Sequence, residues 1–402
     1  MREIILNNGI KTCIKVNSNT PRIALSMNFT INKPEKYAGQ YLLMNRLLLK
    51  GTEKYTSEQL STILDENAID LFSEMKYDYL RFRFVALNED FDLAMSILSD
   101  IVLNSTFEEF EKEKNKLKGE IMAELDSAKV KVSDLFTKTI YKGHFYGHSY
   151  TNILEEIDNV TFEDVKNSYF EILNNSEKKL ALVGDIDENF AIEKLDYYLN
   201  EISSQENIAT QIITPKNTLQ EYVEIIKDDA QQAQIIQGWK VPTLGSEDYA
   251  KLMLLNVILG ASGLSSRLFL ELREKKGLAY TVRSSYETRG KSATFSIYIG
   301  TEPSNIETSI KGFKEEIEKI KNILVSDEEL YNAKNNIIGK QQFITETNSQ
   351  QANLMAYYSI CGKPFDYQKD VIECIRKVTP QELQECAQKC FTENYVLAVL
   401  KP

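Results

Sequence analysis

Residues 24–51 read ALSMNFTINKPEKYAGQYLLMNRLLLKG, which is an alternating run, a charged turn and an apolar segment that ends at Gly51. Alternation of apolar and polar side chains predicts a β-strand, and the longer apolar segment predicts a buried helix. Residues 234–260, QIIQGWKVPTLGSEDYAKLMLLNVILG, follow the same plan and end at Gly260. The chain therefore carries one strand–turn–helix unit in each of its halves.

Further landmarks recur in the same order in both halves. An alternating strand that enters a loop and then a helix occurs at 79–102 and again at 294–317. Charged helices follow in each half. Each half then closes with a helix that begins at a Val-Thr pair, from Val160 and from Val378, and with a short apolar strand. Matches in this order predict a duplicated domain.

The duplication predicts two tandem domains, at 1–205 and 219–402, joined by the polar stretch 201–220. Each half is long enough to build its own hydrophobic core. Strands that alternate apolar and polar residues are typical of antiparallel sheets with one face covered by helices. We therefore expect an α+β fold, with a mainly antiparallel sheet covered by helices in each domain, rather than a doubly wound parallel sheet.

Composition excludes several classes of function. The 402 residues are 43% hydrophobic and 26% charged, as in a globular protein. The net charge of −12 argues against a nucleic-acid-binding surface, which needs an excess of Lys and Arg. No apolar run approaches the roughly 18 residues of a membrane helix, and the first residues alternate like a strand, unlike a signal peptide. The odd number of cysteines, five, indicates a reducing compartment, so we expect a cytoplasmic protein without membrane contact.

A resemblance to a known family becomes specific at residues 39–52, GQYLLMNRLLLKGT. This segment resembles the zinc-site helix of the pitrilysin/insulinase-type metallopeptidases, which include the mitochondrial processing peptidase and carry G-x-x-H-x-x-E-H-x-x-x-K-G-T there. The leading Gly and the final Lys-Gly-Thr match. Leu42 and Arg46, however, stand in place of the two histidines, and Asn45 stands in place of the glutamate.

These substitutions remove the chemistry of the motif. Histidines at i and i+4 of a helix point the same way and can share one zinc ion, while the glutamate deprotonates the metal-bound water. Leu42 has no ligand atom, Arg46 brings a fixed positive charge, and Asn45 accepts no proton. The resemblance places the family's distal zinc ligand at Glu120. We expect no zinc in this half, and a salt bridge between Glu120 and Arg46 is the alternative to a metal site.

The resemblance also bears on how the first half would contact a substrate. In the family, an Asn-Ala pair on the strand at the edge of the sheet contacts the extended peptide. Here the corresponding positions are Leu71 and Phe72, within NAIDLFSEMKYDYLRF at 67–82. This departure argues against direct pairing of the first half with a substrate.

The second half resembles the family more closely. Residues 260–287, GASGLSSRLFLELREKKGLAYTVRSSYE, resemble its signature G-x-x-x-S-S-R-L-F-x-x-x-R-E-x-x-G-L-A-Y-x-V. Arg273 and Tyr280 take the places of an Arg/Tyr pair that, in the family, binds the substrate backbone and stabilises the tetrahedral intermediate. A guanidinium and a phenol are donors that can aim at a developing oxyanion. The alternative is a structural pair, with a packing Tyr at a strand start and an Arg capped by a Glu. Tight turns or close backbone approaches are expected at three glycines of the signature: Gly260, Gly263 and Gly277.

Two i,i+4 pairs are weaker candidates. His144 and His148, in KGHFYGHSY, are the only histidines, and the glycines and aromatic residues around them predict a loop that does not bind metal. Cys386 and Cys390 are expected to be buried free thiols on an apolar face of the last helix.

The resemblance implies a function. Family members form a clamshell of four such domains, and in the two-chain forms one protomer supplies zinc and the general base while its partner supplies the Arg/Tyr pair. We expect this chain to be the second kind of protomer. It would be a non-catalytic, substrate-binding subunit that has no cofactor of its own, forms a heterodimer with a zinc-motif homologue and acts on extended peptides. The alternatives are a catalytically inert scaffold or binding protein of the same fold, and an independent hydrolase, for which the sequence offers no nucleophile–base pair.

Overall fold

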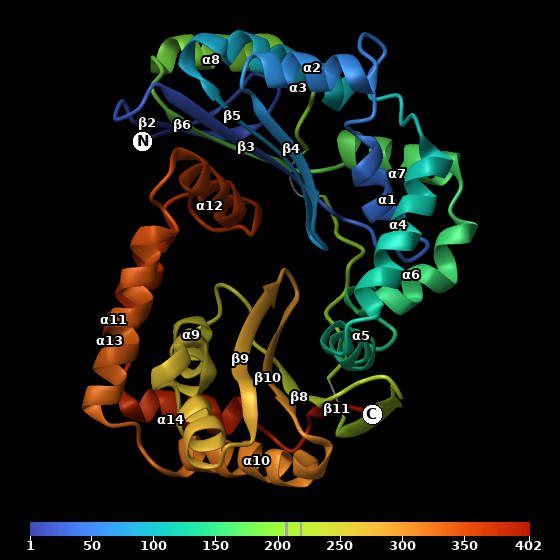
Figure 1. The fold of residues 1–402 in the computed structure, drawn as a ribbon. Coiled ribbons are helices and arrows are strands. Elements are labelled where there is room, and N and C mark those ends of the chain that lie inside the picture. Colours follow the sequence, from blue (N-terminus) through green and yellow to red (C-terminus); the bar gives the residue numbers. More distant parts are fainter. Residues whose placement is uncertain (206–207, 218) are drawn as a thin grey trace. The chain divides into compact units, whose positions relative to one another are not determined.

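The computed structural model describes residues 1–205, 208–217 and 219–402, and it divides the chain into two compact units (Figure 1). Each unit combines most of one half of the chain with a short segment of the other half. The first unit is bounded by Met1–Gly119, Asn152–Ile212 and Gln342–Tyr367, and the second by Glu120–Thr151, Ile213–Gln341 and Gln368–Pro402.

The sheet of the first unit has six strands in the order β1-β2-β6-β3-β5-β4. Neighbouring strands are antiparallel except β2 and β6, which are parallel. The strands are β1 (Arg2–Ile5), β2 (Lys11–Val16), β3 (Arg22–Thr30), β4 (Asp70–Met75), β5 (Tyr79–Leu87) and β6 (Lys178–Gly184). Strand β4 is therefore an edge strand, with one side of its backbone unpaired by the sheet.

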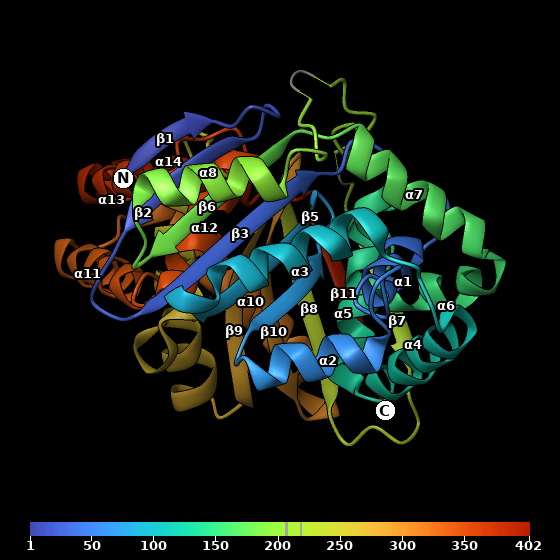
Figure 2. The same cartoon turned by 90° about the horizontal axis from the view of Figure 1, so that it is seen from above.

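Two long helices, α3 and α8, pack on each other and lie across one face of this sheet, as Figure 2 shows. Thr and Asp side chains cap several helices of this unit, which explains where those helices begin. The helices are α1 (Gln40–Leu47), α2 (Ser57–Glu66), α3 (Phe91–Asn104), α4 (Phe110–Leu125), α6 (Tyr150–Glu156), α7 (Phe162–Asn174), α8 (Glu188–Tyr198) and α12 (Asn348–Ile360).

The second unit is built on a five-stranded sheet in the order β7-β11-β8-β10-β9, in which only β7 and β11 are parallel. The strands are β7 (Glu221–Ile226), β8 (Ala233–Val241), β9 (Ala279–Arg289), β10 (Ser292–Thr301) and β11 (Val396–Lys401). The helices are α5 (Ala128–Ile140), α9 (Tyr249–Asn256), α10 (Ile306–Asn322), α11 (Asp327–Phe343), α13 (Gln368–Lys377) and α14 (Pro380–Cys390).

The two sheets confirm the duplication and the α+β fold. The order β2-β6-β3-β5-β4 in the first unit has the same connectivity as β7-β11-β8-β10-β9 in the second. The one parallel pair falls at the same place in both sheets. Only β1 has no counterpart among the described strands of the second unit.

One helix of each half packs on the sheet of the other half's unit. Helix α12 lies on β3 and β6, where Ala352 and Ala356 pack against small residues that include Ala24 and Ala181. Small side chains on both surfaces let the helix approach the sheet closely. Helix α5 lies on β8 and β11 of the second sheet. A Cβ added at Gly238 would lie 2.5 Å from Cζ of Phe136, so this close approach requires glycine.

The packing of α12 and α5 on the sheet of the other half's unit, an exchange of helices between the halves, corrects two expectations. The compact units are discontinuous, whereas the sequence predicts contiguous domains at 1–205 and 219–402. The sheets were expected to have helices on one face, but α12 covers a second face of the first sheet, so β6 is buried along its whole length. The described residues of the predicted linker at 201–220 form neither helix nor strand, while residues 206, 207 and 218 of that linker lie outside the described residues.

Within the described part of the chain, no helix combines the length and the apolar character needed to cross a bilayer.

Candidate functional site

Helix α1 carries the three positions at which the two zinc-binding histidines and the catalytic glutamate of the motif are replaced. Gly39 precedes the helix with φ 86°, a left-handed conformation that favours glycine. A Cβ at Gly39 would also lie 2.6 Å from Cγ2 of Ile153, so no larger residue fits at this helix start. Leu42, Asn45 and Arg46 follow at i, i+3 and i+4, which places them on one face of the helix.

Arg46 is paired with a buried carboxylate on α4. Its guanidinium lies 3.8 Å from Glu113, and Lys50, one turn further along the chain, lies 2.9 Å from the same carboxylate. The two cations compensate the charge of Glu113, whose side chain is otherwise shielded from water. Glu120 lies two turns further along α4, on the same face of the helix as Glu113. The expected pairing of Arg46 with Glu120 stays a prediction.

Asn45 links helix α1 to the edge strand β4 through two hydrogen bonds. Its Nδ2 donates to the carbonyl of Ser73 at 3.4 Å, and Ser73 Oγ donates to the carbonyl of Asn45 at 3.3 Å. The side-chain oxygen of Asn45 is buried and accepts no hydrogen bond from any described residue. The amide therefore holds backbone positions together and offers no group that could take a proton.

The residues of this face do not fit a zinc ion. Zinc sites in proteins use Cys, His and carboxylate ligands, and Leu42, Asn45 and Arg46 supply none of these. Among the described residues, no group of three or more His, Cys, Asp or Glu side chains could hold a metal ion. This face of α1 therefore carries an arginine paired with the buried Glu113 at a position where the motif has a zinc-binding histidine.

Leu71 and Phe72 lie on β4, at the edge of the first sheet. Leu71 is buried, while Phe72 is exposed and contacts the guanidinium of Arg83, whose central carbon lies 4.9 Å from the ring centroid. Both residues thus lie on a strand at the edge of the sheet, as expected, and their equivalence to the substrate-contacting pair stays a prediction.

Arg273 and Tyr280 lie on either side of a tight turn in the second unit. Arg273 belongs to the π-helical turn Phe269–Lys275, and Tyr280 lies near the start of β9. Arg273 Nη1 donates to the carbonyl of Tyr280 at 2.6 Å, and its guanidinium contacts the rings of Phe269 and Tyr280, each centroid at 4.8 Å. π-helical turns are rare and frequently mark functional sites.

The phenol of Tyr280 faces solvent. The residue is 78% exposed, the largest exposure of any large hydrophobic residue in the described chain. Neither its hydroxyl nor the other N–H groups of Arg273 have a hydrogen-bond partner among the described residues. The pair therefore presents several unused donors at one point of the surface.

Arg267, six residues earlier in the signature, is a structural arginine. Its Nε and Nη2 donate to the two carboxylate oxygens of Glu329 at 2.8 and 2.6 Å. This bidentate pair raises the pKa of Arg267 above its usual value, since Glu329 stabilises the charged form. Arg273 has no such carboxylate in the described chain, so the alternative of an Arg capped by Glu describes Arg267 rather than Arg273.

The three glycines of the signature have the backbone roles expected of them. A Cβ at Gly260 would lie 2.1 Å from the backbone nitrogen of Ser284, which requires a close approach of β9. Gly263 and Gly277 adopt φ of 73° and 62°, in the left-handed region that favours glycine.

The two histidines form a loop, as predicted. Nδ1 of His144 accepts from the backbone N–H of Tyr146 at 3.0 Å, so Nε2 carries the proton and donates to the carbonyl of Ile213 at 2.9 Å. Both ring nitrogens of His144 are thus used within the second unit. His148 packs its ring edge-on against Phe145.

Cys386 and Cys390 are buried free thiols on α14, also as predicted. The hydrogen bond with Cys390, together with burial, raises the pKa of the Cys386 thiol. A thiol kept neutral in this way is a poor nucleophile.

Sequence reasoning missed the acids that hold the two arginines, Glu113 and Glu329. One signal was available for Glu113, since it precedes Glu120 by seven residues on a helix and therefore shares its face. Glu329 lies 62 residues from Arg267 and gives no such signal.

Two family models match consecutive parts of the chain. Residues 30–156 match the model described as Insulinase (Peptidase family M16), and residues 159–337 match the model described as Peptidase M16 inactive domain. The larger match thus falls on a domain that its model describes as inactive.

Curated relatives cover nearly the whole chain. The "Uncharacterized zinc protease YmxG" of Bacillus subtilis is 24% identical over 401 residues, which cover 98% of this chain and 97% of the relative. An uncharacterized zinc protease of Streptomyces coelicolor is 24% identical over 368 residues, which cover 89% of this chain and 80% of the relative.

Solved structures share the fold over its full length. A protease from Helicobacter pylori superposes with a TM-score of 0.90 at 20% identity, covering 100% of this chain and 99% of the other. A peptidase M16 inactive domain from Pseudomonas fluorescens superposes with a TM-score of 0.88 at 19% identity, covering 100% and 98%.

Proposed function

Because this chain belongs to the M16 family of insulinase-type peptidases, we propose that it is a non-catalytic, substrate-binding subunit that completes the active site of a zinc-bearing partner. The partner is a homologue with an intact zinc motif, and the two chains form a heterodimer. This chain contributes Arg273 and Tyr280 and binds no cofactor itself. Alone, it is inert as a peptidase.

The observation that carries this proposal is the set of unused donors at Arg273 and Tyr280. The carbonyl of Tyr280 holds one N–H of Arg273 at 2.6 Å, and contacts with two aromatic rings limit the movement of the guanidinium. Donors that are positioned before the reaction stabilise developing charge without a cost of reorganisation. The free N–H groups and the phenol would bind the carbonyl oxygens of an extended peptide, and would bind more strongly to an oxyanion.

The second candidate is an inert scaffold or binding protein of the same fold. The observation that favours it is the replacement of the edge-strand pair by Leu71 and Phe72, because an exposed Phe72 held under Arg83 does not offer the polar contacts of an Asn. The two candidates differ in whether the donors of Arg273 take part in peptide cleavage.

The test is a cleavage assay with the full-length chain, alone and mixed with the zinc-motif homologue from the same cell. We expect no cleavage and no stoichiometric zinc for the chain alone, and cleavage of extended peptides by the mixture. Removing one donor of this kind lowers kcat by about 10²–10³-fold, and we expect a loss of this order for Arg273→Ala and a smaller loss for Tyr280→Phe in the mixture.

The matched control is Lys275→Gln, which removes an exposed cation from the same helical turn and should leave the rate unchanged. Full activity of the Arg273→Ala mixture would refute the shared site. Absence of cleavage with every zinc-motif homologue would favour the scaffold.

A cytoplasmic location is part of the proposal, since all five cysteines are free. Fractionation of the source cells tests it.

A further inference from the structure

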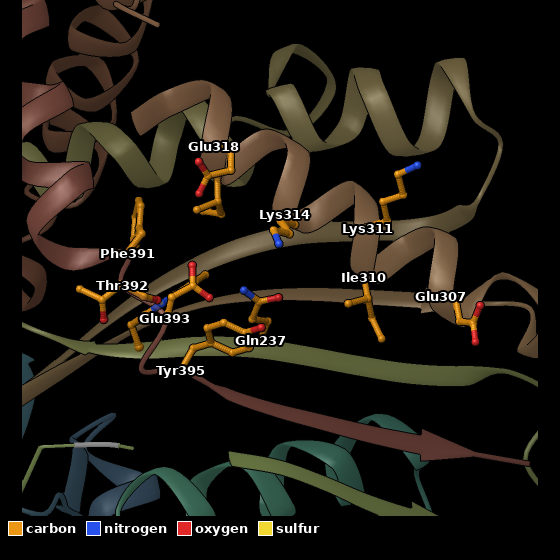
Figure 3. Close-up of a pocket in the computed structure, with 12 residues that line it drawn as sticks. Gln237, Glu307, Ile310, Lys311, Lys314, Glu318, Phe391, Thr392, Glu393 and Tyr395 are labelled. Carbon is orange, nitrogen blue, oxygen red and sulfur yellow. The ribbon is translucent and has the colours of Figure 1, made fainter. Parts of the chain in front are cut away.

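Helices cover both faces of the second sheet. Helix α5 contacts β7, β8 and β11, and helix α10 contacts β8 and β10. The two helices lie on opposite faces, since Trp239 lines the pocket of about 300 Å³ beneath α10 while the neighbouring Gly238 faces Phe136 of α5 (Figure 3). At one end of the sheet, β9 packs against the turn Val257–Ala261. At the other end, only β11 pairs with β7 among the described strands, so the outer edge of β7 is open.

The backbone of β7 directs hydrogen-bonding groups away from the sheet along this edge. The N–H groups of Glu221 and Lys227 donate to carbonyls of the β11 segment, at 3.1 and 2.8 Å. Successive residues of a strand direct their N–H and C=O groups to opposite sides, so every second residue between these two points outward. These residues are Tyr222, Glu224 and Ile226. No described residue bonds to their outward backbone groups.

Two large apolar side chains accompany these backbone groups. Tyr222 is 54% and Ile226 is 63% exposed, because α10 does not extend over β7 and no described residue of β7 lines the pocket beneath it. Between them, Glu224 is compensated by Lys401 at 2.5 Å and accepts from the hydroxyl of Tyr222 at 2.5 Å. The terminal strand of the first sheet, β1, has only four residues and begins with two charged ones, which protects an edge from pairing. Strand β7 is longer and offers a template for another strand.

We propose that β7 pairs with β7 of a second copy of this chain, antiparallel about a two-fold axis at Glu224. The two sheets then form one continuous sheet of ten strands. Tyr222 lies opposite Ile226 of the second copy, and Val223 lies opposite Ile225, each pair occurring twice by symmetry. The outward N–H and C=O groups exchange hydrogen bonds across the axis.

The occupant is a second copy because the sequence of β7 matches itself in this register. A shift by two residues in either direction keeps the backbone groups in phase but places Glu224 opposite Tyr222 or Ile226, so that apolar side chains meet polar ones. At both ends of the chosen register, Glu221 lies opposite Lys227. Each of these already has one ion-pair partner in its own chain, and the pairing adds an opposite charge. No residue of 260–287 takes part, so the pairing is independent of the proposed function.

The first test is sedimentation equilibrium of the full-length protein between about 1 and 200 μM. We expect a reversible monomer–dimer equilibrium with a Kd of about 1–100 μM, since paired edge strands bury a small interface. Ile226→Lys should weaken the dimer at least about tenfold, while Ile323→Lys, the matched control at 61% exposure in the same unit, should leave the Kd unchanged. Glu224→Pro should also weaken it, because Pro removes an outward N–H that has no partner in the described monomer.

Cysteine substitutions test the register, in a Cys374→Ser background that removes the exposed native thiol. Glu224→Cys should form a disulfide with its own copy under mild oxidation. Tyr222→Cys should not do so alone, but should crosslink to Ile226→Cys when the two proteins are mixed, since residues directly opposite lie within reach of a disulfide.

Three results would overturn the proposal. They are a monomer over the whole concentration range, a dimer that both Ile226→Lys and Glu224→Pro leave intact, and crosslinking of Tyr222→Cys to itself as readily as to Ile226→Cys. If the unsubstituted protein does not self-associate and Ile226→Lys prevents binding of the zinc-motif homologue, the edge belongs to that partner and the pairing of two copies is wrong.

Discussion

Two arginines of one signature have different roles because of the side chains that surround them. Arg267 donates to both carboxylate oxygens of Glu329. Arg273 donates one N–H to a backbone carbonyl, and its other N–H groups have no partner among the described residues. The identity of the residue is visible in the sequence in both cases. Which of the two arginines has unused donors depends on an acid 62 positions away in the chain.

Gly260 supports the signature segment through a close backbone contact. A methyl group there would lie 2.1 Å from the backbone nitrogen of Ser284, and backbone atoms cannot move aside as a flexible side chain can. We expect Gly260→Ala to lower the free energy of unfolding by about 1–3 kcal/mol, measured by urea denaturation.

The matched substitution is Gly339→Ala, in helix α11 of the same unit, where an added Cβ meets nothing within 4 Å. It should raise the free energy of unfolding by about 0.5–1 kcal/mol. Equal effects of the two substitutions would contradict the role of the close approach.

Lys178 is a buried cation without a carboxylate partner in the described chain. Its Nζ donates to the carbonyls of Ser176 and Ser203, at 3.1 and 2.6 Å, and burial lowers its pKa to about 8. Below pH 8 the charged form is present in both the folded and the unfolded states, and the folded state bears the cost of burying it. Between about pH 8 and the ordinary pKa of 10.5, the folded state loses the proton first, so stability rises with pH.

We therefore expect Lys178→Met to change the free energy of unfolding more favourably at pH 7 than at pH 9.5. The difference between the two changes should be about 1–3 kcal/mol. Urea denaturation of both proteins at the two pH values measures this difference. If the difference in unfolding free energy between the variant and the unsubstituted protein is independent of pH, burial does not destabilise the charged form of Lys178.

At the scale of elements, helix α12 stabilises the sheet of the first unit, although most of that sheet is far from it in the sequence. Asn348 Nδ2 donates to the carbonyl of Arg22 at 3.0 Å, Lys15 donates to Gln351 at 2.6 Å, and Ala356 is fully buried against the sheet. Residues of the C-terminal half thereby complete the core of the N-terminal unit.

Ala356→Asp should release this helix, because it places an uncompensated charge in that core at a cost of roughly 3–5 kcal/mol. We expect faster hydrogen exchange at β3 and β6, with much smaller changes at β8 and β10. The control is Gln350→Glu, an exposed change that keeps the capping box of α12. Uniform acceleration in both units would contradict a local role for α12.

At the scale of the whole molecule, the exchange means that neither half contains all of its own unit. A fragment 1–205 lacks α12, and a fragment 219–402 lacks α5. We expect each fragment alone to lack the near-ultraviolet circular dichroism of packed aromatic side chains and to bind a hydrophobic dye. Mixing the two fragments should restore the signal, since all elements are then present. Independent, stable folding of either fragment would refute this dependence.

The sequence by itself determined the duplication, the α+β class, the family and the replacement of the zinc motif at Leu42, Asn45 and Arg46, because these depend on periodicity and on motifs whose residues are close together in the chain. The match between the two sheet orders confirms the first of these directly. The tertiary structure alone decided which helix covers which sheet and which acid holds each arginine. It also left the outer edge of β7 without a paired strand among the described residues. These features depend on contacts between residues far apart in the chain, and such contacts form only when the strands and helices pack.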